Sequence, residues 1–206
     1  MTRSPSPLLG RRPARSGPAI SLLPEKSELS LTCGRVHEAC GPARRSLAIW
    51  VAAQVSGMVL WVGPGWNKDR LHADGMVEWA DPARFIFVDA LRAEDVLWTL
   101  EEALRSGAVP LVIGDLPGLP GLTQVRRLHL AAENGGKSGA YLPLGLILTP
   151  DQGGAQGVET RWHLQPDHAR HAEQWRLCRL RARTAPQAHW TLRRMDRTLT
   201  LQSQAA

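Results

Sequence analysis

The sequence has few cysteines and no long apolar run. Its three cysteines, Cys33, Cys40 and Cys178, match no metal-ligand spacing, and their odd number argues against a disulfide framework. We therefore expect reduced thiols packed into the fold. No apolar run approaches the roughly 20 residues that cross a bilayer, and no uninterrupted apolar core marks a secretory signal. These absences predict a soluble, cytoplasmic protein.

Complete catalytic and metal-binding motifs are missing as well. The seven histidines form no HExxH pattern, and no serine lies in a nucleophile elbow. His168 and His171 have helical spacing, which alone is a weak ligand signal, so we expect the histidines to lie on the surface. The sequence thus predicts no metal site, no cofactor and no hydrolase activity.

Length and charge suggest one domain with tails. The 206 residues are 43% hydrophobic and 21% charged, as in globular proteins, and suffice for one α/β domain. Residues 1–45 carry eight Lys or Arg against three acids (+5), residues 46–160 eight against thirteen (−5), and residues 161–206 nine against three (+6). Such asymmetry is typical of a solvated basic tail or of contact with nucleic acid or an acidic protein surface. Residues 1–30, rich in Pro, Ser and Arg, predict a disordered leader, residues 31–200 the domain, and residues 201–206 a tail.

Short apolar runs alternate with helical patterns from residue 35 to residue 149. Apolar spacing predicts helices near residues 44–57, 93–107 and 123–134. The intervening runs, residues 35–40, 58–62, 84–88, 109–115 and 144–149, read as strands, with a glycine-rich loop at 135–139. Continuous apolar strands between helices indicate a mostly parallel sheet covered on both faces.

The remaining segments alternate apolar with polar or basic residues. Residues 159–165, 174–183 and 188–195 therefore predict antiparallel strands that extend one edge of the sheet. Their arginines alternate with tryptophans, which suits backbone contacts and stacking to nucleic acid but equally suits a basic face that discourages edge-to-edge association. These arginines are Arg176, Arg179, Arg181, Arg183, Arg193 and Arg194.

Tryptophan is unusually frequent, with eight residues against one tyrosine and two phenylalanines. Trp50 and Trp98 fit the core faces of their predicted helices. Trp66 falls in a Gly-Pro-Gly-Trp loop at the carboxyl edge of the sheet, where α/β folds place their binding sites. It is a candidate contact for a protein partner or an unstacked base, with packing against the adjacent helix as the alternative.

The segment "GRVHEACGPARRSLAIW", Gly34 to Trp50, predicts a strand, a turn and a helix, the context of a phosphate-binding loop. That loop has the pattern GxxxxGK[ST], in which backbone N–H groups wrap the phosphate. Gly41 is present, but no GK[ST] follows it. Arg44, Arg45 and Ser46 could bind an anion at the helix N-terminus, although a turn kept for folding and surface arginines account better for the pattern.

Two further matches to nucleotide-binding motifs are partial. Gly136, Lys137 and Ser138 spell the end of a phosphate loop, but they follow a helix where a strand is required. Asp115 ends a buried strand, where related folds place a carboxylate that orients magnesium, but without the loop lysine we expect it to cap the following turn. We accordingly predict a degenerate nucleotide site and no enzyme.

The motifs and element order resemble the RecA core over roughly residues 30–195. "GRVHEACGP" resembles the strand that leads into the RecA phosphate loop, "LRSGAVPLVIGD" the helix and strand of its second nucleotide motif, and "RARTAPQAHWTL" a later strand pair. "GPGWNK" has no acid where RecA keeps its catalytic glutamate. The resemblance implies a RecA-like fold without a working ATPase.

A closer resemblance is to the alphaproteobacterial ImuA family, through "RVHEACGPARRSLA", "AEDVLWTLEEALRSGAVPLVI", "GLTQVRRLHLAAE" and "GVETRWHL". It implies an accessory factor for translesion synthesis in the SOS response. The implied partners are ImuB, a polymerase-like adaptor, and an error-prone DnaE-type polymerase, with RecA and DNA as further candidates. Two alternatives stay open: a residual ATPase that remodels protein on DNA, and an SOS cell-division inhibitor of RecA ancestry.

Overall fold

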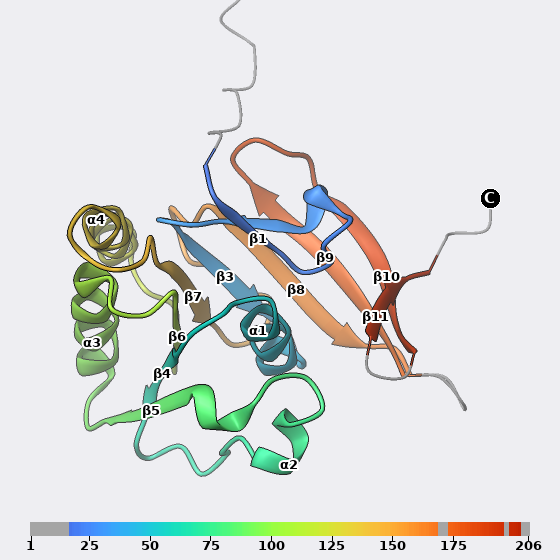
Figure 1. The fold of residues 1–206 in the computed structure, drawn as a ribbon, viewed down its shortest axis with the longest axis horizontal. Coiled ribbons are helices and arrows are strands. Elements are labelled where there is room, and N and C mark those ends of the chain that lie inside the picture. The colour runs from blue at the N-terminus through green and yellow to red at the C-terminus, as the bar shows by residue number, and fades with distance from the viewer. Residues whose placement is uncertain (1–16, 169–172, 196–197, 203–206) are drawn as a thin grey trace, which may run out of the picture.

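The computed structural model describes residues 17–168, 173–195 and 198–202, in which most strands belong to one large sheet (Figure 1). The strands of the first half are β1 (Ala19–Ser21), β2 (Ser30–Thr32), β3 (Val36–Cys40), β4 (Val59–Pro64), β5 (Phe85–Ala90), β6 (Leu111–Asp115) and β7 (Leu144–Leu148). Those of the C-terminal part are β8 (Thr160–Pro166), β9 (Gln174–Ala182), β10 (Ala188–Met195) and β11 (Thr198–Leu201). The helices are α1 (Arg44–Ala53), α2 (Ala73–Met76), α3 (Ala93–Ser106) and α4 (Leu122–Ser138), with 3₁₀ turns η2 (Ser27–Leu29) and η3 (Pro82–Arg84).

Nine strands form one sheet in the order β11-β10-β9-β8-β3-β7-β6-β4-β5. The six strands from β8 to β5 are mutually parallel, and β9, β10 and β11 are added antiparallel. The predicted α/β class is confirmed: a mostly parallel sheet flanked by helices, with antiparallel C-terminal strands, consistent with a RecA-like arrangement. The prediction that residues 159–165 form an antiparallel edge strand was wrong in one respect. This strand, β8, pairs in parallel with β3 and so belongs to the parallel part of the sheet.

Each face of the sheet has its own hydrophobic core. On one face α1 packs over β3, β7 and β8, and its buried Leu47, Trp50 and Val51 join the larger core. On the other face α3 and α4 lie side by side and cover β3 to β7, with Leu100, Leu104 and Leu128 fully buried (Figure 1). Within the described ranges, no helix combines the length and apolarity needed to cross a membrane.

Part of the predicted disordered leader is structured. Residues 1–16 lie outside the described part of the chain, but β1 and β2 pair as an antiparallel hairpin with η2 between them. Leu22, Leu29 and Leu31 from this hairpin are at most 2% exposed in the core that also contains Trp162 and Leu177. The apolar residues are too few and too irregularly spaced to give a periodic signal, so only tertiary packing reveals the segment.

The glycine-rich stretch at 135–138, expected as a loop, is the last part of α4. A Cβ added to Gly135 would lie 2.1 Å from the Leu104 carbonyl oxygen, so the glycine allows α4 to approach the end of α3 closely. Gly136, Lys137 and Ser138 therefore occupy a helix C-terminus, where the helix dipole disfavours a phosphate. A second difference lies at the end of the chain, where β11 extends the sheet through Leu201, one residue into the expected tail.

We predict that Leu29→Ala destabilises the protein by about 2–4 kcal/mol, because it leaves a cavity beneath the hairpin. Urea unfolding followed by tryptophan fluorescence measures the change. Ser27→Ala is the matched control, since Ser27 lies in the same turn but is exposed and should change the free energy of unfolding by under about 0.5 kcal/mol. Equal stabilities for the two variants would show that the hairpin is not part of the folded core.

Candidate functional site

The loop between β3 and α1 is the counterpart of a phosphate-binding loop. Gly41 has φ +90°, a left-handed conformation that favours glycine, and α1 begins three residues later at Arg44. Residues 34–50 thus form the expected strand, turn and helix. The sequence does not show what the loop's backbone donors contact.

Those donors are already bonded within the protein. The Gly41 N–H donates to the Asp151 carbonyl at 2.8 Å, and the Ala43 N–H donates to the Leu164 carbonyl at 3.1 Å. Pro42 has no N–H, and the Arg44 N–H donates to the Gly41 carbonyl at 3.2 Å. A phosphate cradle requires successive free N–H groups, so this loop is closed as an anion site.

Strand β8 closes the loop from the side. A Cβ built on Gly41 would lie 2.6 Å from the Leu164 carbonyl oxygen and 2.8 Å from His163 Nε2. His163, expected on the surface, is only 6% exposed, and its Nε2 has no hydrogen-bond partner among the described residues. Gly41 is therefore required by this close packing as well as by its backbone conformation.

Asp115 pairs with the two arginines that follow the loop. Its buried carboxylate accepts a 2.7 Å hydrogen bond from Arg45 Nε, and Arg44 Nε lies 3.9 Å away. The interpretation of Arg44 and Arg45 as surface charge was wrong, because each side chain is only about a quarter exposed. The carboxylate contacts these guanidinium groups rather than capping the next turn. Ser46 is half-buried, and its hydroxyl has no hydrogen-bond partner in the part of the chain that the structure describes. A carboxylate held by two cations is poorly suited to orient magnesium.

A residue that the sequence analysis missed lies beneath the loop. Glu38, in the middle of β3, is fully buried and accepts hydrogen bonds from Thr149 Oγ1 at 2.7 Å and from the Gly154 N–H at 2.8 Å. Its other oxygen pairs with Arg161 Nε on β8 at 2.5 Å. The available signal was an acid inside a strand predicted to be covered on both faces, since such an acid requires a partner.

The C-terminal strands separate the candidate arginines onto two faces. On the face covered by the β1–β2 hairpin, Arg179 is 8% exposed and lies 5.6 Å and 5.2 Å from the ring centroids of Trp162 and Trp190. Its Nη1 donates to the Glu28 carbonyl at 2.7 Å. This arginine, a candidate for a partner or nucleic-acid contact, instead packs within the fold.

Arg194 is held in a similar way on the same face. Its guanidinium lies 4.7 Å from the ring centroid of Trp79 and pairs with Glu78 at 2.7 Å and Glu173 at 3.0 Å. Trp79 in turn belongs to a cluster with Trp50 and Trp175, whose centroids are 5.0 Å apart. Arg194 is thus also unsuited to an external contact.

The other four arginines share the opposite face of the strands. The register sets Arg181 opposite Arg161, whose side chain points to Glu38, and sets Arg176 opposite Thr191. Arg176, Arg181 and Arg193 are exposed, and the Arg183 side chain is 53% exposed. The strand period of two separates Arg176 from Trp175, and a β-bulge in β9, where the register shifts between Arg161 and Trp162, turns Arg181 to the same face as Arg176. Tryptophan and exposed arginine therefore lie on different faces and cannot form one stacking surface.

Trp66 is 53% exposed in the loop after β4. Two more exposed apolar side chains, Leu91 at 87% and Leu119 at 55%, follow the adjacent strands β5 and β6. Since carboxyl ends of parallel strands meet at one edge, we call Trp66, Leu91 and Leu119 the apolar carboxyl edge.

Trp98 was expected on the core-facing side of its helix. It is 62% exposed instead.

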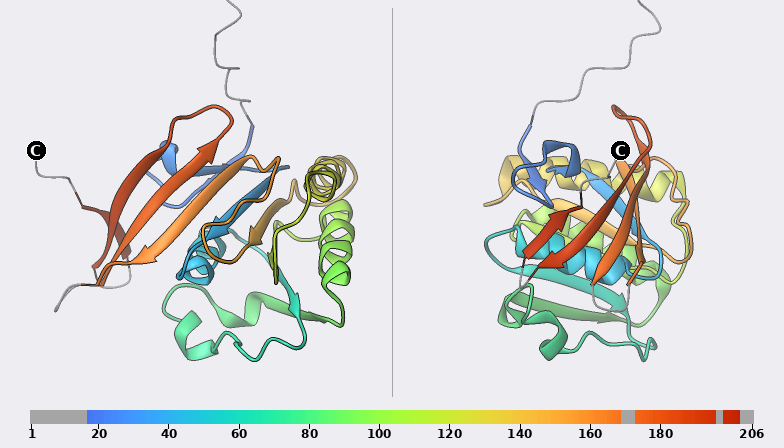
Figure 2. Two further views of the ribbon diagram at one scale, coloured as in Figure 1. Left: turned by 180° about the vertical axis from the view of Figure 1, so that it is seen from behind. Right: turned by 90° about the vertical axis from the view of Figure 1, so that its right-hand side faces the viewer.

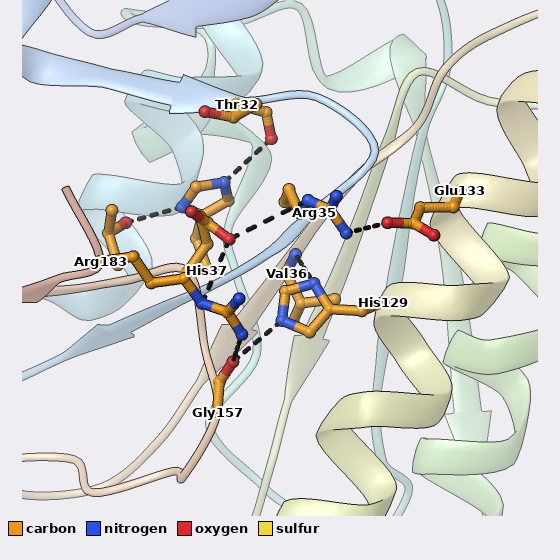
Figure 3. A network of polar contacts seen from close by, with 10 residues as sticks. Thr32, Arg35, Val36, His37, His129, Glu133, Gly157 and Arg183 are labelled. Atoms are coloured by element: carbon orange, nitrogen blue, oxygen red, sulfur yellow. Dashed lines mark hydrogen bonds and ion pairs between the residues drawn. The ribbon is translucent and has the colours of Figure 1, made fainter. Parts of the chain in front are cut away.

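Two buried histidines lie near the start of β3 (Figure 3). His129 Nδ1 accepts the Val36 N–H at 3.2 Å, and its Nε2–H donates to the Gly157 carbonyl at 3.1 Å. His37 Nε2–H donates to the Thr32 carbonyl at 3.0 Å, and Nδ1 accepts from Thr160 at 2.6 Å. The expectation of surface histidines was therefore wrong for this pair. Burial lowers the pKa of both imidazoles to about 4.

Ion pairs surround the two histidines. Arg35 pairs with Glu133 on α4 and lies 4.0 Å from Glu159, which Arg183 approaches at 3.6 Å (Figure 3). Arg35 also helps to keep both imidazoles neutral, since its positive charge lowers their pKa. These contacts are structural links between β3, α4 and the segment before β8. In the described ranges no group of three or more His, Cys, Asp or Glu side chains could hold a metal ion.

The histidine pair predicts acid destabilisation. Below about pH 6.5 the unfolded chain binds protons at His37 and His129 that the folded chain does not. The free energy of unfolding therefore decreases as the pH is lowered from about 6.5 to about 4. In urea titrations near pH 5 these two histidines should contribute about 2.7 kcal/mol per pH unit to the slope, which corresponds to two protons. His163, whose pKa is also lowered by burial, adds to the slope with the same sign.

His129→Gln should lower this slope by about 1.4 kcal/mol per pH unit, because it removes one of the two buried imidazoles. His189→Gln, at an exposed position, is the comparison variant. A stability that does not vary between about pH 6.5 and 5 would contradict the neutral assignment.

A scan of the sequence against protein-family models finds no match, and a search of curated proteins finds none either.

Proposed function

We propose that the chain is a non-catalytic, RecA-like accessory factor in damage-induced mutagenesis, a member of the ImuA family. In this role it supports translesion synthesis in the SOS response by binding a polymerase-like adaptor (ImuB) and an error-prone DnaE-type polymerase, in the cytoplasm. RecA and DNA are additional candidate partners. The resemblance of residues 30–195 supports the pathway, and the geometry of the loop supports the absence of catalysis.

The observation that carries the proposal is the closed phosphate loop. The N–H groups of Gly41, Ala43 and Arg44 are all bonded to carbonyl groups of the chain itself. ATP binding would have to break these bonds and move β8 away from Gly41. It would also have to separate Asp115 from Arg45, leaving a buried carboxylate without its partner.

The residual ATPase alternative is disfavoured for the same reasons. Phosphoryl transfer depends on positioned cations at the phosphates and a carboxylate that holds magnesium. Here Arg44 and Arg45 neutralise the Asp115 carboxylate, and the loop after Gly41 contains no lysine. The chain retains the scaffold of the site while its polar groups bind one another.

The apolar carboxyl edge is the better-suited surface for a protein partner. Protein interfaces depend on a few exposed aromatic or aliphatic side chains that become fully desolvated. Trp66, Leu91 and Leu119 supply such side chains from three neighbouring strand ends. An ion pair of 2.5 Å between Arg70 and Asp89 ties the Trp66 loop to the end of β5.

We predict that the protein binds no labelled ATP analogue with magnesium at micromolar concentrations, because the N–H groups of Gly41, Ala43 and Arg44 already donate to carbonyl groups of the chain. Fluorescence anisotropy measures binding, and Asp115→Ala is the companion variant. Micromolar binding that is lost in Asp115→Ala would overturn the non-catalytic assignment in favour of the ATPase.

We further predict that Trp66→Ala weakens capture of the polymerase-like adaptor at least tenfold, because a hot-spot tryptophan contributes about 2 kcal/mol or more. Co-purification of the two full chains and lesion-bypass assays measure the effect. Trp98→Ala is the matched control, since Trp98 is equally exposed but lies on α3. Binding to the division GTPase without adaptor binding would instead favour the cell-division inhibitor.

A further inference from the structure

The face of β8, β9 and β10 opposite the β1–β2 hairpin carries no helix. Seen from behind, no helix lies in front of these strands, and α3 and α4 lie beside them (Figure 2, left). The burial pattern along β9 agrees, because Trp175, Leu177 and Arg179 are buried while Arg176 between them is exposed. Arg181 is exposed on the same side as Arg176, since the β-bulge after Arg179 reverses the alternation. We call this surface the open basic face, and its charged members are Arg176, Arg181, Arg183 and Arg193.

Its cations are only partly neutralised. Arg176 pairs with exposed Asp167 at 3.2 Å, and Arg183 lies 3.6 Å from Glu159. Arg181 and Arg193 form no ion pair with any residue of the described ranges. The Arg176 pair is exposed on both sides, so it contributes little and can exchange for a stronger anion. Arg183, which also donates to the Gly157 carbonyl at 3.2 Å, keeps about half of its side chain exposed.

Neutral side chains between the arginines extend the same chemistry. Thr191 lies opposite Arg176, and Thr200 lies opposite Arg193. His189 lies opposite Cys178 and Gln165 lies opposite Arg176, so both face this side of the sheet. Both are exposed. Arginine with hydroxyl and amide groups is the donor set that contacts nucleic-acid phosphates.

The open basic face has no exposed tryptophan, tyrosine or phenylalanine and little exposed apolar surface among the described residues, and these absences narrow the choice of binding partner. Single strands are bound by stacking on aromatic side chains, but the tryptophans of these strands lie on the opposite face. A folded protein partner needs an apolar interface core, whereas the only strongly exposed apolar side chain here is Met195, among the residues described. A polar, positively charged surface without either feature matches the sugar-phosphate backbone of a duplex.

We propose that the open basic face binds the phosphate backbone of duplex DNA without sequence preference. Arg176 and Arg183 are seven residues apart on or beside one strand, which spans about 23 Å, about the rise of seven base pairs along the axis of a duplex. The net charge of +6 adds a long-range attraction to such a polyanion. This inference deepens the proposed function, on which it rests for its cellular setting, by naming the surface that meets DNA.

The test measures anisotropy of a labelled duplex of about 30 base pairs with the purified full chain. At low salt the protein should bind, with log affinity falling against log salt with a slope of about −3 to −4, as four phosphate contacts require. The double variant Arg181→Glu/Arg193→Glu should bind at least tenfold more weakly and lower the slope by about 2. Both side chains are exposed, so unfolding curves should match the wild type.

Arg92→Glu/Arg126→Glu is the control, since it changes net charge equally at exposed positions away from the face. It should retain binding within about threefold, because only long-range attraction is reduced. Absence of duplex binding, or equal losses in both variants, would overturn the inference. So would a clear preference for single strands or polyglutamate, which would assign the face to another polyanion. Adaptor capture separates the two proposals. Retained capture by Arg181→Glu/Arg193→Glu, together with weakened duplex binding, supports both. A wild-type chain that captures the adaptor but binds no duplex removes only the DNA surface.

Discussion

The closed state of the loop depends on one buried ion pair. Glu38 has no exposed surface, and its carboxylate accepts from Thr149, from two backbone N–H groups of residues 154 and 155, and from Arg161. Arg161 also donates to the Ala155 carbonyl at 2.9 Å. Removing either partner would leave an uncompensated charge in the interior, at a cost of several kcal/mol. The pair therefore holds β3, β8 and the segment after β7 in one arrangement.

That arrangement explains why the loop cannot act as a phosphate cradle. The segment fixed by Glu38 includes Asp151, whose carbonyl accepts the Gly41 N–H. The same pair holds β8 beside β3, so that Leu164 accepts the Ala43 N–H. Two features distinguish this loop from a phosphate cradle: a missing lysine, visible in the sequence, and backbone donors bonded to a neighbouring segment, visible only in the fold. The second feature makes restoration of the lysine alone insufficient.

Local signals explain which features could be predicted. The helix at 93–106 has acids in its first turn, one apolar face and Gly107 in the left-handed conformation at its end, so the sequence defines it closely. The prediction of a loop at 135–138 was wrong because glycine favours loops locally, whereas here the missing side chain of Gly135 allows α3 and α4 to pack closely. His37 and Glu38 lie in a buried strand, but their partners Thr160 and Arg161 are more than 120 residues away, beyond any sequence period. The tryptophan and arginine pattern was visible, yet its division between two faces required the register of β9.

The same division gives the molecule two chemically different surfaces. The apolar carboxyl edge lies at the ends of β4, β5 and β6, and the open basic face lies on β8, β9 and β10. Five steps in the sheet separate β9 from β4, which is about 24 Å at the usual strand spacing. A protein bound at the edge and a duplex bound on the face would therefore occupy separate parts of the domain. Because one rigid sheet supports both, their relative position would be fixed by strand order alone, without any motion driven by ATP.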